Sequence, residues 1–111
     1  MNLYQKSAQG VMEIKGDKKS LGYDIKQHPL NFKVFECELN QQSSSFFVFS
    51  DGVTDQVGGE KKLMYGKKRV LHQIMEAVDV KTAVSSIVAD VEKYHGLNKR
   101  RDDLTLFGFA V

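Results

Sequence analysis

The chain has 111 residues, of which 41% are apolar and 27% are charged, and these proportions are typical of a folded globular domain rather than a disordered segment. The 16 basic and 14 acidic residues leave a net charge of +2, which is too balanced to indicate binding to nucleic acid or to a membrane surface. The single cysteine, Cys37, excludes an internal disulfide. With no signal peptide and no apolar run of about 20 residues, the sequence favours the cytoplasm and contains no membrane segment.

The first half of the chain is predicted to contain short strands. Gly10–Ile14 and residues 20–23 lie on either side of a polar turn and predict a β-hairpin. In residues 32–39 apolar and charged side chains alternate, which predicts a strand with one buried face and makes Cys37 an ordinary core residue. The apolar run at residues 46–49 is aromatic and β-branched, and it predicts a strand buried on both faces.

Two helices are predicted in the second half of the chain, after a polar loop at residues 56–62. The first helix begins near Gly66 or Lys67, and the second has Asp79 as its N-cap and ends at Gly96. Apolar side chains recur at helical spacing in both segments, so each helix is expected to bury one face. These residues are Val70, Leu71, Ile74, Met75 and Val78 in the first helix, and Ala83, Val84, Ile87, Val88, Val91 and Tyr94 in the second.

Two aspartates lie at the ends of predicted strands. Asp51 follows the strand at residues 46–49, and Gly52 allows the chain to turn sharply there. Asp102 precedes residues 104–111, which are nearly all apolar and predict a central strand. If these two strands pair antiparallel, both carboxylates lie at one edge of the sheet, where they can share a hard cation such as Mg²⁺ or Mn²⁺. An ordinary aspartate–glycine turn without a metal is the alternative that these residues leave open.

Four motifs in this part of the chain resemble those of a known enzyme family. They are Ser-Asp-Gly-Val-Thr-Asp-Gln at residues 50–56, Gly59-Glu60, Tyr65-Gly66-Lys67-Lys68-Arg69-Val70 and Asp102-Asp103-Leu104-Thr105. In this order and spacing they look like the metal-dependent protein phosphatases, and most like the bacterial branch of sporulation stage II protein E serine phosphatases. Each motif alone is weakly diagnostic, whereas the four together make the resemblance specific.

The resemblance implies an α+β fold in which two antiparallel sheets form a β-sandwich flanked by helices. It also implies hydrolysis of phosphoserine or phosphothreonine on a partner protein, with a binuclear Mn²⁺ or Mg²⁺ centre that generates the attacking hydroxide. Asp51 and Asp102 match the metal-ligating aspartates of the family, and Gly52 and Asp103 match positions next to the metals. In bacterial members the phosphorylated partner is notably a small anti-sigma-factor antagonist domain.

The first half of the family's domain has no counterpart in this sequence. Its aspartate and aspartate-x-x-glycine-x-glycine motifs do not occur before Asp51. Residues 1–111 are therefore expected to be a single partial domain, the C-terminal portion of a catalytic domain, with only part of the sandwich and a helical hairpin. We expect the isolated chain to be poorly active, because two carboxylates do not assemble two closely spaced metals.

Loss of half of the sandwich also predicts a homodimer or a domain-swapped assembly, because apolar strand residues then need another surface. The residues concerned are Phe47, Phe49, Phe107 and Phe109.

The basic runs at residues 67–69 and 99–101 are interpreted as solvated surface, although Arg100 and Arg101 are candidates to orient a phosphate beside Asp102. Two alternative functions stay open: a non-catalytic regulatory or binding half-domain in a bacterial signalling pathway, and a phosphate-binding sheet domain without metal.

Overall fold

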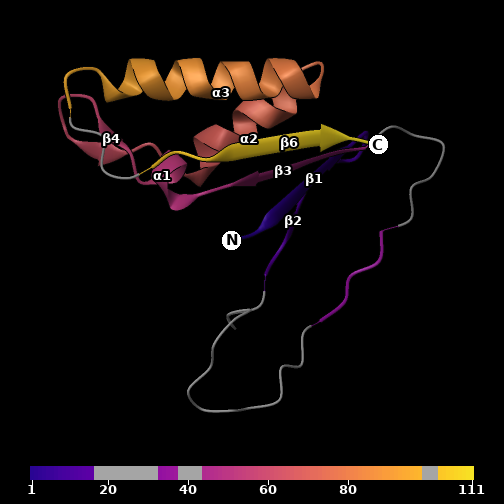
Figure 1. Cartoon of the computed structure of the whole chain (residues 1–111). Helices are drawn as coiled ribbons and strands as arrows, with labels where there is room; N and C mark the ends of the chain where they lie inside the picture. The colour runs from indigo at the N-terminus through magenta and orange to yellow at the C-terminus, as the bar shows by residue number, and fades with distance from the viewer. Residues whose placement is uncertain (17–32, 38–43, 99–102) are drawn as a thin grey trace, which may run out of the picture.

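The computed structural model describes residues 1–16, 33–37, 44–98 and 103–111, which form a four-stranded antiparallel sheet with two helices over one face (Figure 1). The strand order is β2-β1-β3-β6. The α+β class predicted from the sequence is confirmed. In chain order the elements are β1 (Leu3–Ser7), β2 (Gly10–Ile14), β3 (Ser45–Phe49), α1 (Asp51–Thr54), β4 (Val57–Gly58), β5 (Leu63–Met64), α2 (Lys67–Glu76), α3 (Val80–His95) and β6 (Leu106–Ala110).

The N-terminal strand β1 occupies the middle of the sheet, although the sequence analysis did not predict it. It pairs antiparallel with β2 on one side and with β3 on the other. The predicted strand at Gly10–Ile14 is confirmed as β2, and its partner in the described residues is β1, joined to it by a tight turn that ends at Gly10. Gly10 has a φ of +120°, which favours a residue without a side chain. Residues 20–23, the predicted partner, lie outside the described residues.

The hydrophobic core lies between the sheet and the two long helices. Tyr4 of β1 and Phe47 of β3 are register partners and point toward the helices together, and the Tyr4 ring also stacks on Phe49 with centroids 4.9 Å apart. Gly108 of β6 allows α3 to approach closely, because a Cβ there would lie 2.9 Å from Val80 Cγ1. Full burial of a large apolar side chain contributes about 1.5–3 kcal/mol. The core residues are Tyr4, Phe47, Phe49, Val53, Tyr65, Val70, Ile74, Ala83, Ile87 and Val91.

Both ends of α3 follow the sequence prediction. The Asp79 carboxylate accepts the backbone N–H of Thr82 at 2.7 Å as the N-cap, and Gly96 ends the helix with a φ of +53°. The start of α2 at Lys67 is also as predicted. Among the described residues, no helix combines the length and apolarity needed to cross a bilayer.

The apolar stripes of the two helices are narrower in the structure than predicted. Met75, Val78 and Val88 were expected in the core, but all three are exposed. The sheet covers only the centre of each stripe, so apolar residues at its margins stay in solvent. Spacing alone identifies the direction of the buried face and not its width.

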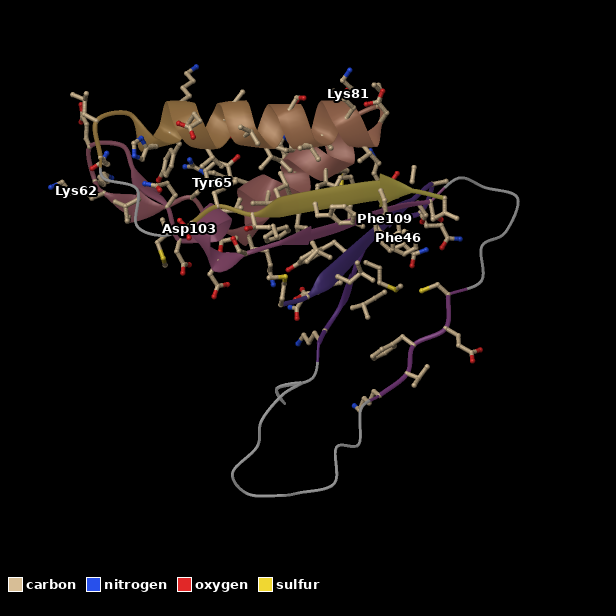
Figure 2. All side chains as sticks on the ribbon, viewed as in Figure 1. Phe46, Lys62, Tyr65, Lys81, Asp103 and Phe109 are labelled. Atoms are coloured by element: carbon tan, nitrogen blue, oxygen red, sulfur yellow. The ribbon has the colours of Figure 1, made fainter. Side chains whose placement is uncertain are left out.

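The face of the sheet turned away from the helices is apolar and only partly covered by the described residues, and we call it the far face. Phe46 and Phe109 stack on this face with ring centroids 5.2 Å apart (Figure 2). Phe46 is buried there, whereas Phe107 and Phe109 are exposed. The expectation that Phe47 would also need another surface is wrong, because Phe47 lies under the helices, as does Phe49. From the strand registers the far face comprises Leu3, Gln5, Met12, Ile14, Phe46, Val48, Phe107 and Phe109.

Three predictions about individual segments are wrong. Strand β6 was expected at the centre of a sheet, but among the described residues it pairs only with β3 and so lies at the edge of the sheet. Residues 33–37 of the predicted strand 32–39 have no strand pairing, and Cys37 is exposed rather than part of the core. An alternating pattern produces a strand only where a neighbouring strand supplies hydrogen bonds, and Figure 1 shows this segment apart from the sheet.

The region predicted as a polar loop at residues 56–62 contains an ordered hairpin instead. Strands β4 and β5 pair antiparallel, Val57 with Met64 and Gly58 with Leu63. Gly59 and Lys62 take positive φ angles of 72° and 49° in the turn between them. The hairpin is anchored at its base, where Tyr65 donates its backbone N–H to the Gln56 carbonyl at 2.7 Å.

Candidate metal centre

The antiparallel pairing of β3 and β6 brings the end of one strand beside the start of the other. Ser50, directly after β3, joins the two segments. Its backbone N–H donates to the Thr105 carbonyl at 2.9 Å, and its Oγ accepts the Thr105 N–H at 3.0 Å. The same hydroxyl donates to the Asp103 carbonyl at 3.3 Å. The serine of the motif therefore fixes the edge of the sheet at which the aspartates are found.

Gly52 makes the closest approach between these two segments. A Cβ at this position would lie 2.0 Å from the backbone oxygen of Asp103, which no side chain can tolerate. Gly52 is buried in the short helix α1, and its φ is not positive, so the close approach rather than the backbone angle requires glycine here. The glycine of the motif thus allows α1 to pack against the segment that leads into β6.

Asp51 begins α1 and is exposed, and Asp103 is exposed on the neighbouring segment. Figure 2 shows Asp103 at the end of the sheet where α1 lies. The predicted antiparallel pairing of the two strands is confirmed, and it places Asp51 and Asp103 at one edge of the sheet. It does not test the carboxylate pair predicted from the sequence, Asp51 with Asp102. Asp102 lies outside the described residues, as do Arg100 and Arg101, so their predicted roles stay predictions.

The chemistry of this edge suits a hard divalent cation. Carboxylate and carbonyl oxygens are the ligands that Mg²⁺ and Mn²⁺ prefer, and Mg²⁺ is commonly held by one or two carboxylates while it keeps several waters. Within the described residues, no group of three or more His, Cys, Asp or Glu side chains is placed to hold an ion. The described part of the edge thus supplies oxygen atoms of the kind that such ions prefer, without a complete ligand set.

A hollow of about 240 Å³ opens beside Asp51. Tyr4 and Phe49, which stack on each other, line it on the apolar side, and Thr54 and Lys67 bring polar groups. Lys67 comes from the first turn of α2, and the sequence analysis had interpreted it as solvated surface. The one feature of the sequence that could have indicated a role for Lys67 is its position directly after Gly66 in the third motif. That position does not show which residues the start of α2 approaches in the fold.

The third motif holds the small hairpin against α3. Tyr65 donates its hydroxyl hydrogen to Asp90 at 2.5 Å, and the Tyr94 hydroxyl donates to the Leu63 carbonyl at 2.7 Å. The guanidinium of Arg69 lies over the Tyr94 ring, 4.4 Å from its centroid. Burial and the neighbouring Asp90 carboxylate both raise the pKa of the Tyr65 hydroxyl, so it stays protonated as a donor. Tyr65 and Arg69 of this motif therefore have a structural role, together with Tyr94 of α3.

Comparison with known protein families decides the assignment. The profile described as Stage II sporulation protein E matches residues 2–111. The chain belongs to this family. The stage II sporulation protein E family comprises serine/threonine phosphatases of the PP2C type. A search among curated proteins finds no match.

A solved structure supports the same fold. The SiaA-PP2C domain of Pseudomonas aeruginosa is similar to this chain, with a TM-score of 0.76 and 26% sequence identity. The similarity covers 97% of this chain and 42% of that structure, so this member of the sporulation protein E family spans less than half of the solved domain. The described architecture is a partial PP2C-like fold.

Proposed function

We propose that this chain forms the C-terminal part of a metal-dependent phosphatase domain that hydrolyses phosphoserine or phosphothreonine on a partner protein. The observation that carries the proposal is the close packing of Gly52 against Asp103, which places two aspartate-bearing segments at one sheet edge. These segments contain the first and last of the four motifs that resemble the phosphatases. Membership of a phosphatase family supports the same reaction.

In this proposal Asp51 and Asp102 hold Mn²⁺ or Mg²⁺, and Gly52 and Asp103 shape the edge around them. When bound, such ions neutralise phosphate charge and activate the attacking water. Asp51 can act as a ligand because α1 presents its carboxylate to solvent from the fixed end of a strand. Arg100 and Arg101 are proposed to orient the phosphate from the segment before Asp102.

The remaining metal ligands are proposed to come from a part of the domain that this chain does not contain. The chain covers 42% of the solved domain to which it is similar, which supports this view. We therefore expect little phosphatase activity from the 111 residues alone. The proposed substrate is a phosphorylated partner protein such as an anti-sigma-factor antagonist domain, as the family resemblance implies.

The test is a calorimetric titration of Mn²⁺ into the chain and into a variant with Asp51→Asn and Asp102→Asn. Saturable binding that disappears in the double variant is expected. Glu76→Gln, at the exposed end of α2, removes a carboxylate away from the edge and serves as the control. Equal binding by the wild-type chain and the double variant would contradict the assignment of these ligands.

A non-catalytic regulatory half-domain is the competing function. It predicts no Mn²⁺ binding and no phosphatase activity even after the missing part of the domain is supplied. The phosphatase proposal predicts that a chain extended at its N-terminus by that missing part releases phosphate from a phosphopeptide. Asp51→Asn in the extended chain should then abolish the release.

A further inference from the structure

Lys67 and Asp51 line the same hollow, although they belong to different elements of the fold. Asp51 follows β3, whereas Lys67 begins α2. Both line the same space of about 240 Å³. A cationic and an anionic side chain from two different elements thus line one hollow.

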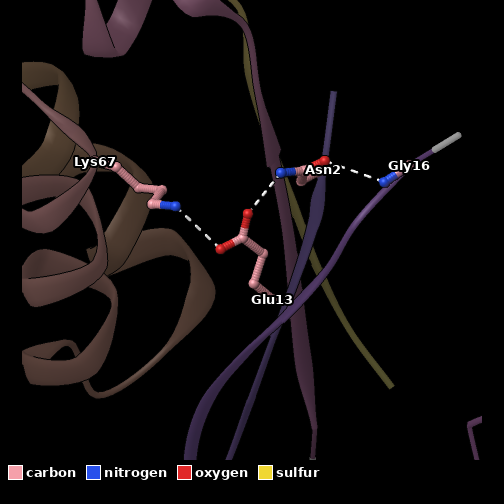
Figure 3. A network of polar contacts seen from close by, with 4 residues as sticks. All are labelled: Asn2, Glu13, Gly16 and Lys67. Carbon is pink, nitrogen blue, oxygen red and sulfur yellow. Dashed lines mark hydrogen bonds and ion pairs between the residues drawn. The ribbon is translucent and has the colours of Figure 1, made fainter. Parts of the chain in front are cut away.

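A polar network fixes the position of the Lys67 ammonium (Figure 3). Lys67 Nζ donates to Glu13 Oε2 of β2 at 3.1 Å. The other carboxylate oxygen of Glu13 accepts the Asn2 side-chain N–H at 2.6 Å, and Asn2 Oδ1 accepts the backbone N–H of Gly16 at 3.0 Å. The Glu13 carboxylate therefore accepts hydrogen bonds from both Asn2 and Lys67, one on each oxygen. The network places the lysine without occupying all of its donors.

The ammonium can accept a further anionic partner. A lysine carries three N–H donors, and the bond to Glu13 uses one of them. The Lys67 side chain is 51% exposed, so a ligand in the hollow can reach it. The hydrogen bond and the charge of Glu13 raise the pKa of Lys67, which keeps the lysine in its cationic form.

We propose that Lys67 binds a phosphate oxygen of the substrate in the hollow beside Asp51. This inference rests on the proposed phosphatase function, because that function puts a phosphomonoester at Asp51. A phosphate dianion in this hollow would be stabilised by the Lys67 ammonium, and by a cation when Asp51 holds one, since each would neutralise part of its charge. The hollow's aromatic side, formed by Tyr4 and Phe49, would meet the carbon atoms of the phosphorylated residue.

The alternative for Lys67 is a purely structural ion pair that joins α2 to β2. Such a pair changes the stability of the chain and leaves phosphate binding unaffected. Phosphate affinity is therefore the measurement that separates the two roles.

The experiment is a titration of inorganic phosphate into the full 111-residue chain, followed by amide chemical shifts in NMR spectra, with and without saturating Mg²⁺. Lys67→Gln is expected to weaken phosphate binding about tenfold, the effect of losing one charge-assisted hydrogen bond. Lys67→Arg keeps the cation and should stay within about threefold of the wild-type affinity. Lys68→Gln, an exposed neighbour outside the hollow, makes the same change in net charge and should have no effect.

Three outcomes overturn the inference: wild-type affinity in Lys67→Gln, an equal loss in Lys68→Gln, or no phosphate binding by the wild-type chain under either condition. Thermal unfolding of each variant confirms that it is folded, and Lys67→Arg tests the site should Lys67→Gln be unstable. Failure of the proposed function is seen separately, as an absence of Mg²⁺ binding that depends on Asp51. In that case the titration without Mg²⁺ still decides the role of Lys67.

Discussion

The backbone of Gly52 packs directly against the carbonyl oxygen of Asp103, although the whole helical hairpin separates the two residues in the sequence. The contact leaves no room for a methyl group, because a Cβ on residue 52 would lie 2.0 Å from that oxygen. The segments that contain Asp51 and Asp103 can lie this close because residue 52 has no side chain. The hydrogen bonds of Ser50 to Thr105 and Asp103 keep them together.

Gly52→Ala is expected to separate these segments. An added methyl group in a tightly packed position typically costs about 1–3 kcal/mol, so the free energy of unfolding should fall by that amount in denaturant titrations. Mn²⁺ binding should weaken as well, because Asp51 moves away from the segment that contains Asp103. Gly59→Ala is the control: its Cβ meets nothing within 4 Å, so any strain from its φ of +72° should leave Mn²⁺ affinity unchanged. Unchanged Mn²⁺ affinity in Gly52→Ala would contradict the proposed site.

Lys6→Met is expected to destabilise the end of α2. The Lys6 ammonium donates to the carbonyl of Ile74 at 2.8 Å and also to the carbonyl of Ala77, both at the C-terminal end of that helix. Methionine keeps much of the apolar stem and leaves these carbonyls without this donor, at a cost of about 1–3 kcal/mol in the free energy of unfolding. Lys81→Met, on the exposed surface of α3 (Figure 2), should cost much less. Equal costs in the two variants would show that the contacts of Lys6 contribute little.

The N-cap of α3 should give a pH-dependent contribution to stability. The backbone N–H of Thr82 donates to the Asp79 carboxylate and lowers the pKa of Asp79 from its ordinary value of 3.8. Since the folded-state pKa is the lower one, the charged cap stabilises the folded chain above pH 3.8, and this contribution is lost as the pH falls through the folded-state pKa.

Thermal unfolding of Asp79→Asn and Asp79→Ala tests this account. Asparagine keeps a cap without charge, so its midpoint should lie between those of wild type and Asp79→Ala at neutral pH. The difference between wild type and Asp79→Asn should shrink as the pH falls below 3.8. A difference that grows under acid would mean that the sign assigned to the pKa change is wrong.

The far face of the sheet predicts self-association of the isolated chain. Phe107 is 59% exposed there, next to the stacked pair of Phe46 and Phe109. Phe107→Ser leaves that pair in place and should lower the average mass measured by light scattering at high concentration. Met75→Ser removes an apolar side chain of similar exposure, 55%, from α2 and should not do so. A wild-type chain that stays monomeric at high concentration would rule out the predicted assembly.

Local patterns in the sequence correctly predicted the two long helices and the strand β3 that precedes Asp51. Caps such as Asp79 and Gly96 act within a few residues, so the sequence around them contains the whole signal. The antiparallel arrangement of the strands that flank Asp51 and Asp103 also followed, because the length between them suits a helical hairpin that returns the chain to the same sheet. These features depend on short-range geometry.

Features that depend on tertiary neighbours could not be predicted in the same way. Apolar residues such as Phe107 indicate that a surface is suited to burial. They do not indicate whether another part of the same chain packs on that surface. Cys37 was placed in a core for the same reason and is exposed. Lys67 was not predicted as a site residue, because its proposed role depends on Glu13 and Asp51. The fold brings these two residues near Lys67 from other elements.

The hydrogen bonds of Ser50 to Thr105 join positions that are 55 residues apart in the chain. The acidic edge therefore has no counterpart in the unfolded chain, and an ion bound to it must be released when the chain unfolds. By mass action such an ion raises the free energy of unfolding, by about 2.7 kcal/mol when its concentration is 100 times its Kd. On the proposed metal site, a higher concentration of divalent ions should therefore slow the proteolysis of the chain.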